Sequence, residues 1–326
     1  MVRLLTDEQV DELVTYEAML PVVGEALRKQ GRGEVERPPS PHFPVGVGLG
    51  DRDPDESTGN GRVMPAHVHG SGYVVTKLVG VHDDNVERGL PAVVADIVVV
   101  DAAVGGVRAL MDATRLTDVR TGCIGGLAAR ELGPPSPVAG VFGAGPQAHA
   151  QTRAVEAAVG IDELRAFSPS DSKYAFAQTM RDEGIDARAV DSPAAVVDGA
   201  EVVVTATNAT EPVFDGTDLD PGTLVVAVGA YSEETRELDG ETVRRAARVF
   251  ADVPPEVAET GDILAGPLDE TDLVPFPDVL AGTAGRESAD ETLVVESIGS
   301  AVMDAAAAEH VLEEAEAHSM GTTVDL

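Results

Sequence analysis

The chain has 326 residues, enough for two domains, and a formal charge of −34 because 57 acidic residues are balanced by only 23 lysines and arginines. This charge repels phosphates and disfavours a nucleic-acid partner, and no apolar run is long enough to span a membrane. The single cysteine, Cys123, excludes an internal disulfide. The apolar start is too short for a signal peptide, so we expect a cytoplasmic protein without membrane contact.

The acidic residues are dispersed along the chain, and lysine occurs only at Lys29, Lys77 and Lys173. A solvated acidic surface that is poor in lysine and aromatic residues suits a cytosol near molar salt, where the Debye length falls to about 3 Å. We therefore predict a halophilic source.

The first third of the chain predicts helices, then strands, then a longer helix. Thr6 and Gln9 have the spacing of a capping box, which marks the first helix. The elements expected next are a helix at 15–30, a polar surface loop at 51–61, strands at 73–79 and 92–100, a hairpin turn at Gly105-Gly106 and a helix from Thr114 to about Leu132.

A glycine-rich turn follows the apolar run at 138–142. Gly143 permits a tight turn, Gly145 lets the backbone approach a pyrophosphate, and Ala148 allows the following helix to pack closely on the strand. The free N–H groups at that helix start attract an anion. The pattern also occurs in ordinary turns, but its order of strand, turn and helix is that of a dinucleotide-binding unit.

Strand-like and helical runs alternate through the rest of the chain. The expected strands lie at 164–167, 201–206, 224–228, 249–252 and 292–297, and a final helix at 301–317. This alternation predicts an α/β fold with a Rossmann-type, doubly wound parallel sheet.

The end of the second strand bears on the cofactor. NAD-binding proteins usually place an acidic residue there to hold the ribose 2′-hydroxyl. Here Ser168 and Ser170 occupy the region, and Lys173 is near enough in sequence to meet a 2′-phosphate. We therefore favour NADP(H), with NAD(H) as the alternative if Asp171 turns toward the ribose.

Two histidines, His67 and His69, would share one face of a strand. No third ligand lies near them in the sequence, so we interpret them as loop histidines and expect no metal.

Several short motifs follow one another at particular spacings. They are Arg62-x-Met64-Pro65-Ala66, Lys77, Arg88-Gly89-Leu90-Pro91-Ala92, Leu116-Thr117-x-x-Arg120-Thr121, Gly143-Ala144-Gly145-x-Gln147-Ala148, Val204-Thr205-Ala206-Thr207, Ala227-Val228-Gly229-Ala230, Arg236-Glu237-Leu238-Asp239 and Glu296-Ser297-Ile298-Gly299. In this order the chain resembles the ornithine cyclodeaminase/mu-crystallin family over nearly its full length.

The resemblance implies a Rossmann domain inserted into a smaller α+β domain. Residues 1–118 and 300–326 would form the substrate-binding and dimerisation domain, and 119–299 the dinucleotide-binding domain. Members of the family act on amino acids or their imines with NAD(H) or NADP(H), so we expect a small-molecule substrate and a homodimer.

The resemblance also assigns Arg62, Lys77 and Arg120 to the substrate carboxylate. The planar fork of arginine suits a carboxylate, and fixing that group orients the reacting carbon. The alternatives are structural ion pairs for the two arginines and a solvent-facing strand position for Lys77.

The remaining family positions concern the cofactor. Gly143, Ala144, Gly145, Gln147 and Ala148 would seat the pyrophosphate, and Thr205 and Thr207 would line the site. Val228, Gly229, Ser297 and Gly299 would border the nicotinamide.

One position departs from the family pattern. Cyclodeaminases and related alanine dehydrogenases carry an aspartate two residues after the glycine at Gly229, whereas this chain has Tyr231. A phenol with an ordinary pKa near 10 is a poor base for deamination at neutral pH. The substitution favours ketimine reduction, for example of Δ1-pyrroline-2-carboxylate, although Tyr231 could instead simply pack beside the cofactor. Alternatives are an alanine dehydrogenase-like enzyme, an ornithine cyclodeaminase and a non-catalytic NADPH-binding protein.

Overall fold

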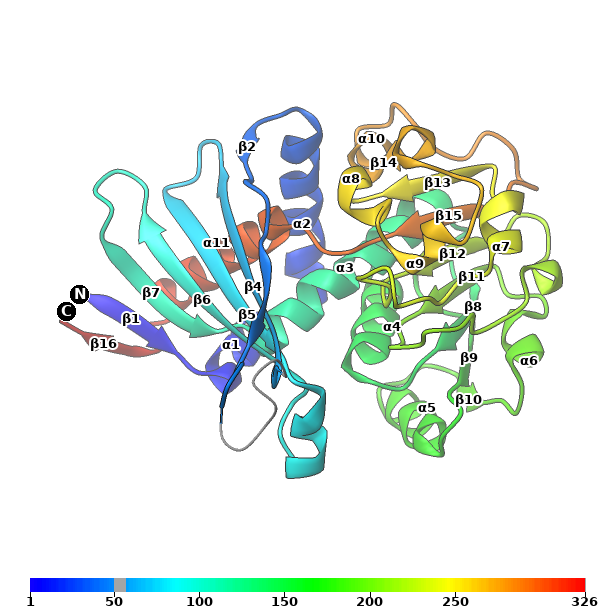
Figure 1. Ribbon diagram of the computed structural model, residues 1–326, viewed down its shortest axis with the longest axis horizontal. Helices are drawn as coiled ribbons and strands as arrows, with labels where there is room; N and C mark the ends of the chain where they lie inside the picture. Colours follow the sequence, from blue (N-terminus) through cyan, green and yellow to red (C-terminus); the bar gives the residue numbers. More distant parts are fainter. Residues whose placement is uncertain (50–56, 326) are drawn as a thin grey trace. The chain divides into compact units, whose positions relative to one another are not determined.

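The computed structural model describes residues 1–49 and 57–325, and contacts within it divide the chain into two compact units (Figure 1). Unit 1 comprises Met1–Thr15, Arg32–Arg120 and Ala301–Leu326. Unit 2 comprises Tyr16–Gly31 and Thr121–Ser300. Helix α2 (Tyr16–Gly31) groups with unit 2 and not with the N-terminal residues around it, because it packs against helices α4 (Pro146–Val159) and α10 (Phe276–Leu280).

Unit 1 contains a mixed sheet in the order β16-β1-β7-β6-β5-β4-β2, with β3 paired to β4. Only the β1–β7 pair is parallel among the pairs described. The strands are β1 (Val2–Leu5), β2 (Val35–Glu36), β3 (His42–Val45), β4 (Gly59–Val68), β5 (Tyr73–Val81), β6 (Val93–Asp101), β7 (Val107–Asp112) and β16 (Thr322–Val324).

Besides the first turns of α3 (Thr114–Leu132), three helices accompany this sheet in the part of the chain that is described: α1 (Asp7–Leu13), the 3-10 helix η1 (Asp83–Arg88) and α11 (Ala301–Ala317). The predicted capping box at Thr6 and Gln9 is present at the start of α1. Helix α11 packs on β4, β5 and β6, and Figure 1 shows it running behind these strands. One face of the sheet is thereby buried.

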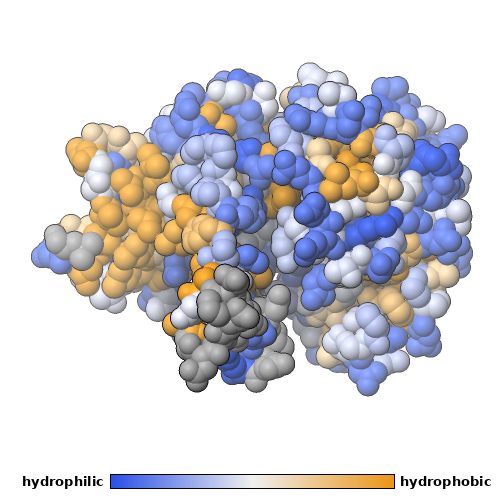
Figure 2. Space-filling model, viewed as in Figure 1, coloured by the Kyte–Doolittle hydropathy of each residue, from blue (hydrophilic) through white to orange (hydrophobic). Residues whose placement is uncertain are grey.

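The opposite face of this sheet carries exposed apolar side chains. Leu78, Val94 and Leu110 come from the three central strands β5, β6 and β7, and all are exposed. Figure 2 shows hydrophobic residues gathered over β6 and β7. A sheet face of this kind normally packs on another surface.

Two local expectations for unit 1 need correction. The end of the loop expected at 51–61 is strand, because Gly59–Val68 pairs with both β3 and β5; residues 51–56 lie outside the described part of the chain. His67 lies on β4 and not in a loop, since Val74 of β5 pairs with it. The hairpin turn at Gly105-Gly106 is confirmed between β6 and β7.

Unit 2 is organised around a parallel sheet in the order β10-β9-β8-β11-β12-β15-β13-β14. Its strands are β8 (Val138–Phe142), β9 (Glu163–Phe167), β10 (Ala187–Ala189), β11 (Val202–Thr205), β12 (Leu224–Ala227), β13 (Arg248–Ala251), β14 (Val274–Pro275) and β15 (Leu293–Glu296). The chain proceeds outward from β8 to β10 and then returns to β11 on the other side of β8. The switch point therefore lies where β8 ends.

Helices lie on both sides of this sheet, with α3 and α4 on one side and α6 and α7 on the other (Figure 1). The helices with residues in unit 2 are α2 (Tyr16–Gly31), α3 (Thr114–Leu132, whose first turns belong to unit 1), α4 (Pro146–Val159), α5 (Ser172–Asp182), α6 (Pro193–Val197), α7 (Gly240–Arg245), α8 (Pro254–Val257), α9 (Gly261–Leu264) and α10 (Phe276–Leu280), with 3-10 turns η2 (Gly216–Asp218) and η3 (Glu270–Asp272). The predicted α/β fold with a doubly wound parallel sheet is confirmed.

The core of unit 2 explains why its strands read as continuous apolar runs. All four residues of β11 and of β12 are buried, as expected for strands covered on both faces. Among the described residues, none of the helices combines the length and apolar character needed to cross a bilayer.

Candidate functional site

Lys77 lies on the buried face of the unit 1 sheet, not on the solvent-facing side. Lys77 and Val75 are two residues apart on β5 and therefore lie on the same face of the sheet, where both side chains are almost fully buried. The register pairs Met64 of β4 with Lys77, so Arg62, two residues from Met64, lies on the same face. The sheet thus places two of the three predicted cations on one surface.

The third cation reaches the same cluster from helix α3. Arg120 is 4% exposed, and Thr117 lies one turn earlier on the helix. The Lys77 Nζ donates to Thr117 Oγ1 at 3.5 Å, a long hydrogen bond. Helix α3 therefore contacts Lys77 directly.

An aspartate that sequence reasoning missed connects these residues. Asp304 lies in the first turn of α11 and is fully buried. Its Oδ1 accepts hydrogen bonds from Lys77 Nζ at 2.7 Å and from Arg120 Nε at 2.8 Å. Its Oδ2 is buried and accepts no hydrogen bond from any described residue. Asp304 lies 227 residues from Lys77 in the sequence, so no local pattern linked them.

The electrostatics of the cluster follow from its burial. Burial and the positive charges of Arg120 and Arg62 lower the pKa of Lys77, Asp304 opposes them, and the resulting pKa is about 7. Burial alone would raise the pKa of Asp304, but the charges and hydrogen bonds of Arg120 and Lys77 outweigh it, so that pKa lies below its usual value. Asp304 is therefore a carboxylate.

The cluster places three cations close together. Lys77 and Arg120 share Asp304 Oδ1, and Arg62 lies near enough for its charge to lower the pKa of Lys77. The planar fork of a guanidinium group matches the two oxygens of a carboxylate. The residues of this cluster therefore fit a small carboxylate.

In unit 2, the glycine turn has the geometry that its sequence predicts. Gly143 follows β8 with φ +113°, and a Cβ there would lie 2.4 Å from the Ala206 carbonyl oxygen. Gly145 caps α4, and a Cβ there would meet no atom within 4 Å. The backbone at Gly145 thus borders open space at the N-terminus of a 14-residue helix. These residues fit the pyrophosphate of a dinucleotide.

The ends of β11 and β12 are held by a buried carboxyl group, Glu237. It accepts hydrogen bonds from Thr205 Oγ1 at 2.8 Å and from Gly229 N at 2.7 Å. It also accepts two from Thr207, from N at 2.6 Å and from Oγ1 at 2.7 Å. The two threonines and Gly229, which we had assigned to the cofactor, therefore form internal bonds that shape this edge of the sheet.

Asp252 organises the end of β15 in a similar way. Its carboxylate accepts from Ser297 Oγ at 2.7 Å, Gly299 N at 2.9 Å and Ile298 N at 3.2 Å. The sequence motif included Ser297 and Gly299 but not Asp252, which directly follows β13.

Two further acidic residues complete this buried group. Asp262 Oδ1 accepts from the N–H groups of Glu237 and Leu238. Burial raises the pKa of Glu237 to about 7 and that of Asp262 to about 6. Burial, together with the other three carboxyl groups, raises the pKa of Glu296 well above its usual value.

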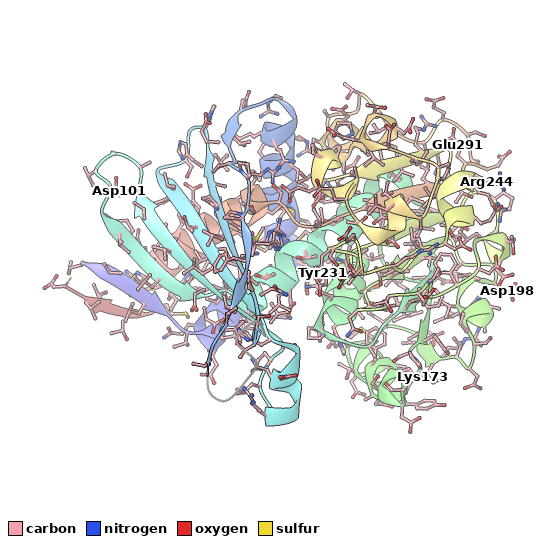
Figure 3. All side chains as sticks on the ribbon, in the orientation of Figure 1. Asp101, Lys173, Asp198, Tyr231, Arg244 and Glu291 are labelled. Carbon is pink, nitrogen blue, oxygen red and sulfur yellow. The ribbon has the colours of Figure 1, made fainter. Side chains whose placement is uncertain are left out.

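The end of β9 presents hydroxyl groups. Ser170 Oγ lies 3.3 Å from Ser168 Oγ and 2.7 Å from Ser172 Oγ. Lys173, labelled in Figure 3 at the start of α5, directs its Nζ to the Val190 carbonyl oxygen at 3.0 Å. Its side chain is mostly buried, so the predicted ligand of the 2′-phosphate is already engaged within unit 2.

Tyr231 follows β12 and is 47% exposed (Figure 3). Its backbone N–H donates to Thr235 Oγ1 at 2.8 Å, which fixes the loop. Val228, before it, donates its N–H to the Thr205 carbonyl oxygen.

Among the described residues, no three His, Cys, Asp or Glu side chains are arranged to hold a metal.

These features define an α/β protein with a dinucleotide-binding turn and a separate cluster suited to a carboxylate. The chain belongs to the ornithine cyclodeaminase/mu-crystallin family, whose model matches residues 2–319. It is 32% identical to an alanine dehydrogenase of Archaeoglobus fulgidus, over 98% of this chain and 97% of that protein. It is 31% identical to the ketimine reductase mu-crystallin of Mus musculus, over 77% and 79%.

A solved structure has the same fold. The Δ1-pyrroline-2-carboxylate reductase of Thermococcus litoralis, in complex with NADH and L-proline, superposes with a TM-score of 0.92 at 29% identity, covering 99% of this chain and 100% of that one.

Proposed function

We propose that this protein is an NAD(P)H-dependent oxidoreductase that reduces an imino acid, such as Δ1-pyrroline-2-carboxylate, to the amino acid. The observation that carries the proposal is the buried cluster of Lys77, Arg120 and Asp304 on the same sheet face as Arg62. Lys77 and Arg120 share a single oxygen of Asp304, and a substrate carboxylate would give these two cations a second acceptor.

The residues divide the work between the two units. Arg62 and Arg120 bind and orient the substrate carboxylate, while the Gly143–Gly145 turn and the start of α4 hold the dinucleotide. The bound cofactor supplies a hydride. Glu237 fixes the backbone at Thr207 and Gly229, and Asp252 fixes Ser297 and Gly299, so that the carboxyl edge of the sheet keeps one shape.

Tyr231 favours imine reduction over cyclodeamination. A deaminase needs a base near neutral pH, and the phenol of a tyrosine is poorly suited to that role. Alanine dehydrogenase activity is the second candidate, supported by 32% identity to the Archaeoglobus fulgidus enzyme over nearly the whole chain. Both candidates use the same carboxylate cluster.

One assay separates these functions. The purified protein is given NADPH or NADH with Δ1-pyrroline-2-carboxylate, then with pyruvate and ammonia, and in parallel ornithine is tested for conversion to proline. Turnover with the cyclic imine exceeding the other two supports the proposal. Tight cofactor binding without turnover of any imine would instead support a binding protein.

The dinucleotide site is tested by Gly145→Ala. The added methyl would meet no protein atom, so folding is retained while the approach of the pyrophosphate is blocked. Cofactor affinity measured by nicotinamide fluorescence should fall at least about tenfold. Gly285→Ala, at a glycine that is also unobstructed, is the control and should leave affinity unchanged.

We further propose NADP(H) as the preferred cofactor. The support is local: the hydroxyls of Ser168, Ser170 and Ser172 gather after β9, where an NAD-specific site would place a carboxylate. Comparing KM for NADPH and NADH tests this, and a lower KM for NADH would contradict it.

We propose that the exposed apolar face of the unit 1 sheet packs on a second copy of the chain. The face presents Leu78, Val94 and Leu110, and a self-complementary apolar patch suits a twofold dimer. Leu110→Asp should halve the mass measured by light scattering. Val104→Asp, which adds the same charge at the neighbouring hairpin, should not.

A halophilic source remains our proposal for the charge of −34. Dense salt would screen the repulsion among the acidic groups. The melting temperature should therefore rise markedly from dilute to concentrated KCl, and an unchanged value would remove this explanation.

A further inference from the structure

The hydrogen bonds of Lys77 leave one of its donors unused. Its ammonium has three N–H groups, and Asp304 Oδ1 and Thr117 Oγ1 accept two of them. No other described residue accepts the third. The side chain is only 1% exposed, and a buried donor without a protein acceptor is unusual, so this donor is available to a ligand in the cluster.

Lys77 differs from the neighbouring arginines because it can release a proton. Arg62 and Arg120 stay charged at any accessible pH and suit a carboxylate, but they cannot release a proton. Lys77 is surrounded by Arg120 on α3, Arg62 on β4 and Asp304 on α11, and burial with the two arginines brings its pKa to about 7. It is the group in this cluster that can give up and regain a proton near neutral pH.

We infer that Lys77 is the general acid that protonates the imine nitrogen of the substrate, and that Asp304 is the positioning residue that orients its ammonium. This inference rests on the proposed function and deepens it. The substrate carboxylate is left to the two arginines.

The chemistry balances with one proton and one hydride. A Lys77 N–H bond breaks as a new N–H bond forms on the imine, which becomes an iminium ion. The iminium carbon then gains the hydride, a C–H bond forms, and the C=N π pair moves to nitrogen. The imine is reduced by two electrons, the nicotinamide is oxidised, and Lys77 regains its proton from water.

Asp304 contributes through two contacts. Its Oδ1 binds Lys77 and Arg120 at once, so it fixes the distance between the proton donor and the carboxylate anchor. Its negative charge also raises the pKa of Lys77 and so favours the protonated form, which is the one that can donate a proton. Its role is therefore exerted through Lys77.

A substrate that needs no proton tests the role of Lys77. The N-methyl iminium form of Δ1-pyrroline-2-carboxylate is permanently charged and bypasses protonation. Lys77→Met should lose about 100-fold or more in kcat on the ordinary imine but less than about tenfold on the methylated one. Equal losses on both would overturn the inference. Lys29→Met, at a lysine outside unit 1, is the control and should retain kcat on each.

Two further measurements test the roles of Lys77 and Asp304 without the methylated substrate: the pH profile of kcat and a direct titration of Lys77. On the ordinary imine, kcat should fall above about pH 7, and Asp304→Asn should move this limb to lower pH by about one unit because the charged lysine loses its partner. Glu309→Gln on the same helix should leave the limb in place. A limb that does not move in Asp304→Asn would contradict the positioning role.

The chain has only three lysines, so isotope-labelled lysine gives three side-chain NMR signals, and Lys77→Met assigns one of them. That signal should titrate near pH 7 in the protein without substrate, and at lower pH in Asp304→Asn. Titration near the ordinary value of about 10.4 would overturn the inference even if imines are reduced. Absence of imine turnover in the unaltered protein would refute the proposed function instead, so the two failures are distinguishable.

Discussion

Each unit buries charged groups, but the two clusters solve the problem in opposite ways. In unit 1, one carboxylate, Asp304, neutralises part of the positive charge of Lys77 and Arg120. In unit 2, the acidic residues Glu237, Asp252, Asp262 and Glu296 lie together, and the first three accept hydrogen bonds from backbone N–H groups or hydroxyls. The first cluster pairs opposite charges, whereas the second gathers like charges and has raised carboxyl pKa values.

The difference teaches where to look for chemistry in this molecule. Backbone N–H groups and threonine hydroxyls donate to Glu237, so this carboxyl group shapes the loops that follow β11 and β12. Buried oxygens without a hydrogen bond occur in both clusters, at Asp304 in unit 1 and at Asp262 and Glu296 in unit 2. What distinguishes the first cluster is a buried lysine beside arginines, with a pKa near neutrality.

Removing one cation from unit 1 should give the largest effect. Arg120→Ala deletes the proposed carboxylate anchor and should lower kcat/KM for the imine by at least about 100-fold, while the affinity for NAD(P)H stays near normal. Steady-state kinetics and cofactor titration measure the two quantities. Arg115→Ala, which removes a partly exposed arginine of the same helix, should change neither. Equal loss of turnover and cofactor affinity in Arg120→Ala would refute its assigned role.

Disturbing the backbone around Glu237 should show that the unit 2 cluster is a support. In Gly229→Ala, the new Cβ would lie 2.1 Å from the Thr207 carbonyl oxygen and 2.6 Å from Glu237 Cδ. The free energy of unfolding should fall by about 2–4 kcal/mol, measured by chemical denaturation. Gly285→Ala, where the methyl meets no atom within 4 Å, should stay within about 1 kcal/mol of the parent. A stable, fully folded Gly229→Ala protein would show that the loop is not rigid.

The two clusters should also respond oppositely to pH. The pKa of Glu237 is raised to about 7 by burial, so its protonation stabilises the folded protein fully below about pH 4.5, and this contribution is lost as the pH rises through about 7. Lys77, with a lowered pKa, contributes stability that increases between about pH 7 and 10.5. Glu237→Gln should therefore flatten the decline of melting temperature across pH 7. An unchanged slope would assign the decline to another group.

The smallest effect is expected at a solvent-exposed ion pair. Arg244 (Figure 3) pairs with Glu241 three residues earlier on α7, and the arginine side chain is 62% exposed. Arg244→Ala should change the free energy of unfolding by less than about 0.5 kcal/mol. A larger loss would mean that surface pairing matters more in this acidic chain than in ordinary proteins.

The sequence predicted those features that depend on local pattern. The turn at Gly143, the helix at Thr114–Leu132 and the helix at Ala301–Ala317 follow from glycine placement and apolar spacing, and the structure confirms them. The buried face for Lys77 could be suspected because lysine is scarce and lies in an apolar strand. These signals span a few residues, which is why one sequence suffices to detect them.

The partners of the site could not be predicted in the same way. Asp304 begins an alanine-rich helix, and nothing nearby indicates that it binds a lysine 227 positions away. Glu237 lies in one of the family motifs, yet its role depends on the backbone N–H groups of Thr207 and Gly229, which follow two different strands. The grouping of α2 with unit 2 likewise depends on its packing against α4 and α10. Each of these follows from the tertiary arrangement and not from periodicity.

Asp304 follows Lys77 and Arg120 by many residues in the sequence, and this order has a consequence for synthesis. A ribosome completes Lys77 and Arg120 long before the helix that carries their carboxylate emerges, and domains tend to fold from the N-terminus onward. Until translation reaches residue 304, the nascent sheet must leave these cations hydrated and its inner face uncovered. Docking of α11 onto the sheet would therefore be the step that completes the cluster, and a polypeptide that ends before residue 304 would lack the carboxylate.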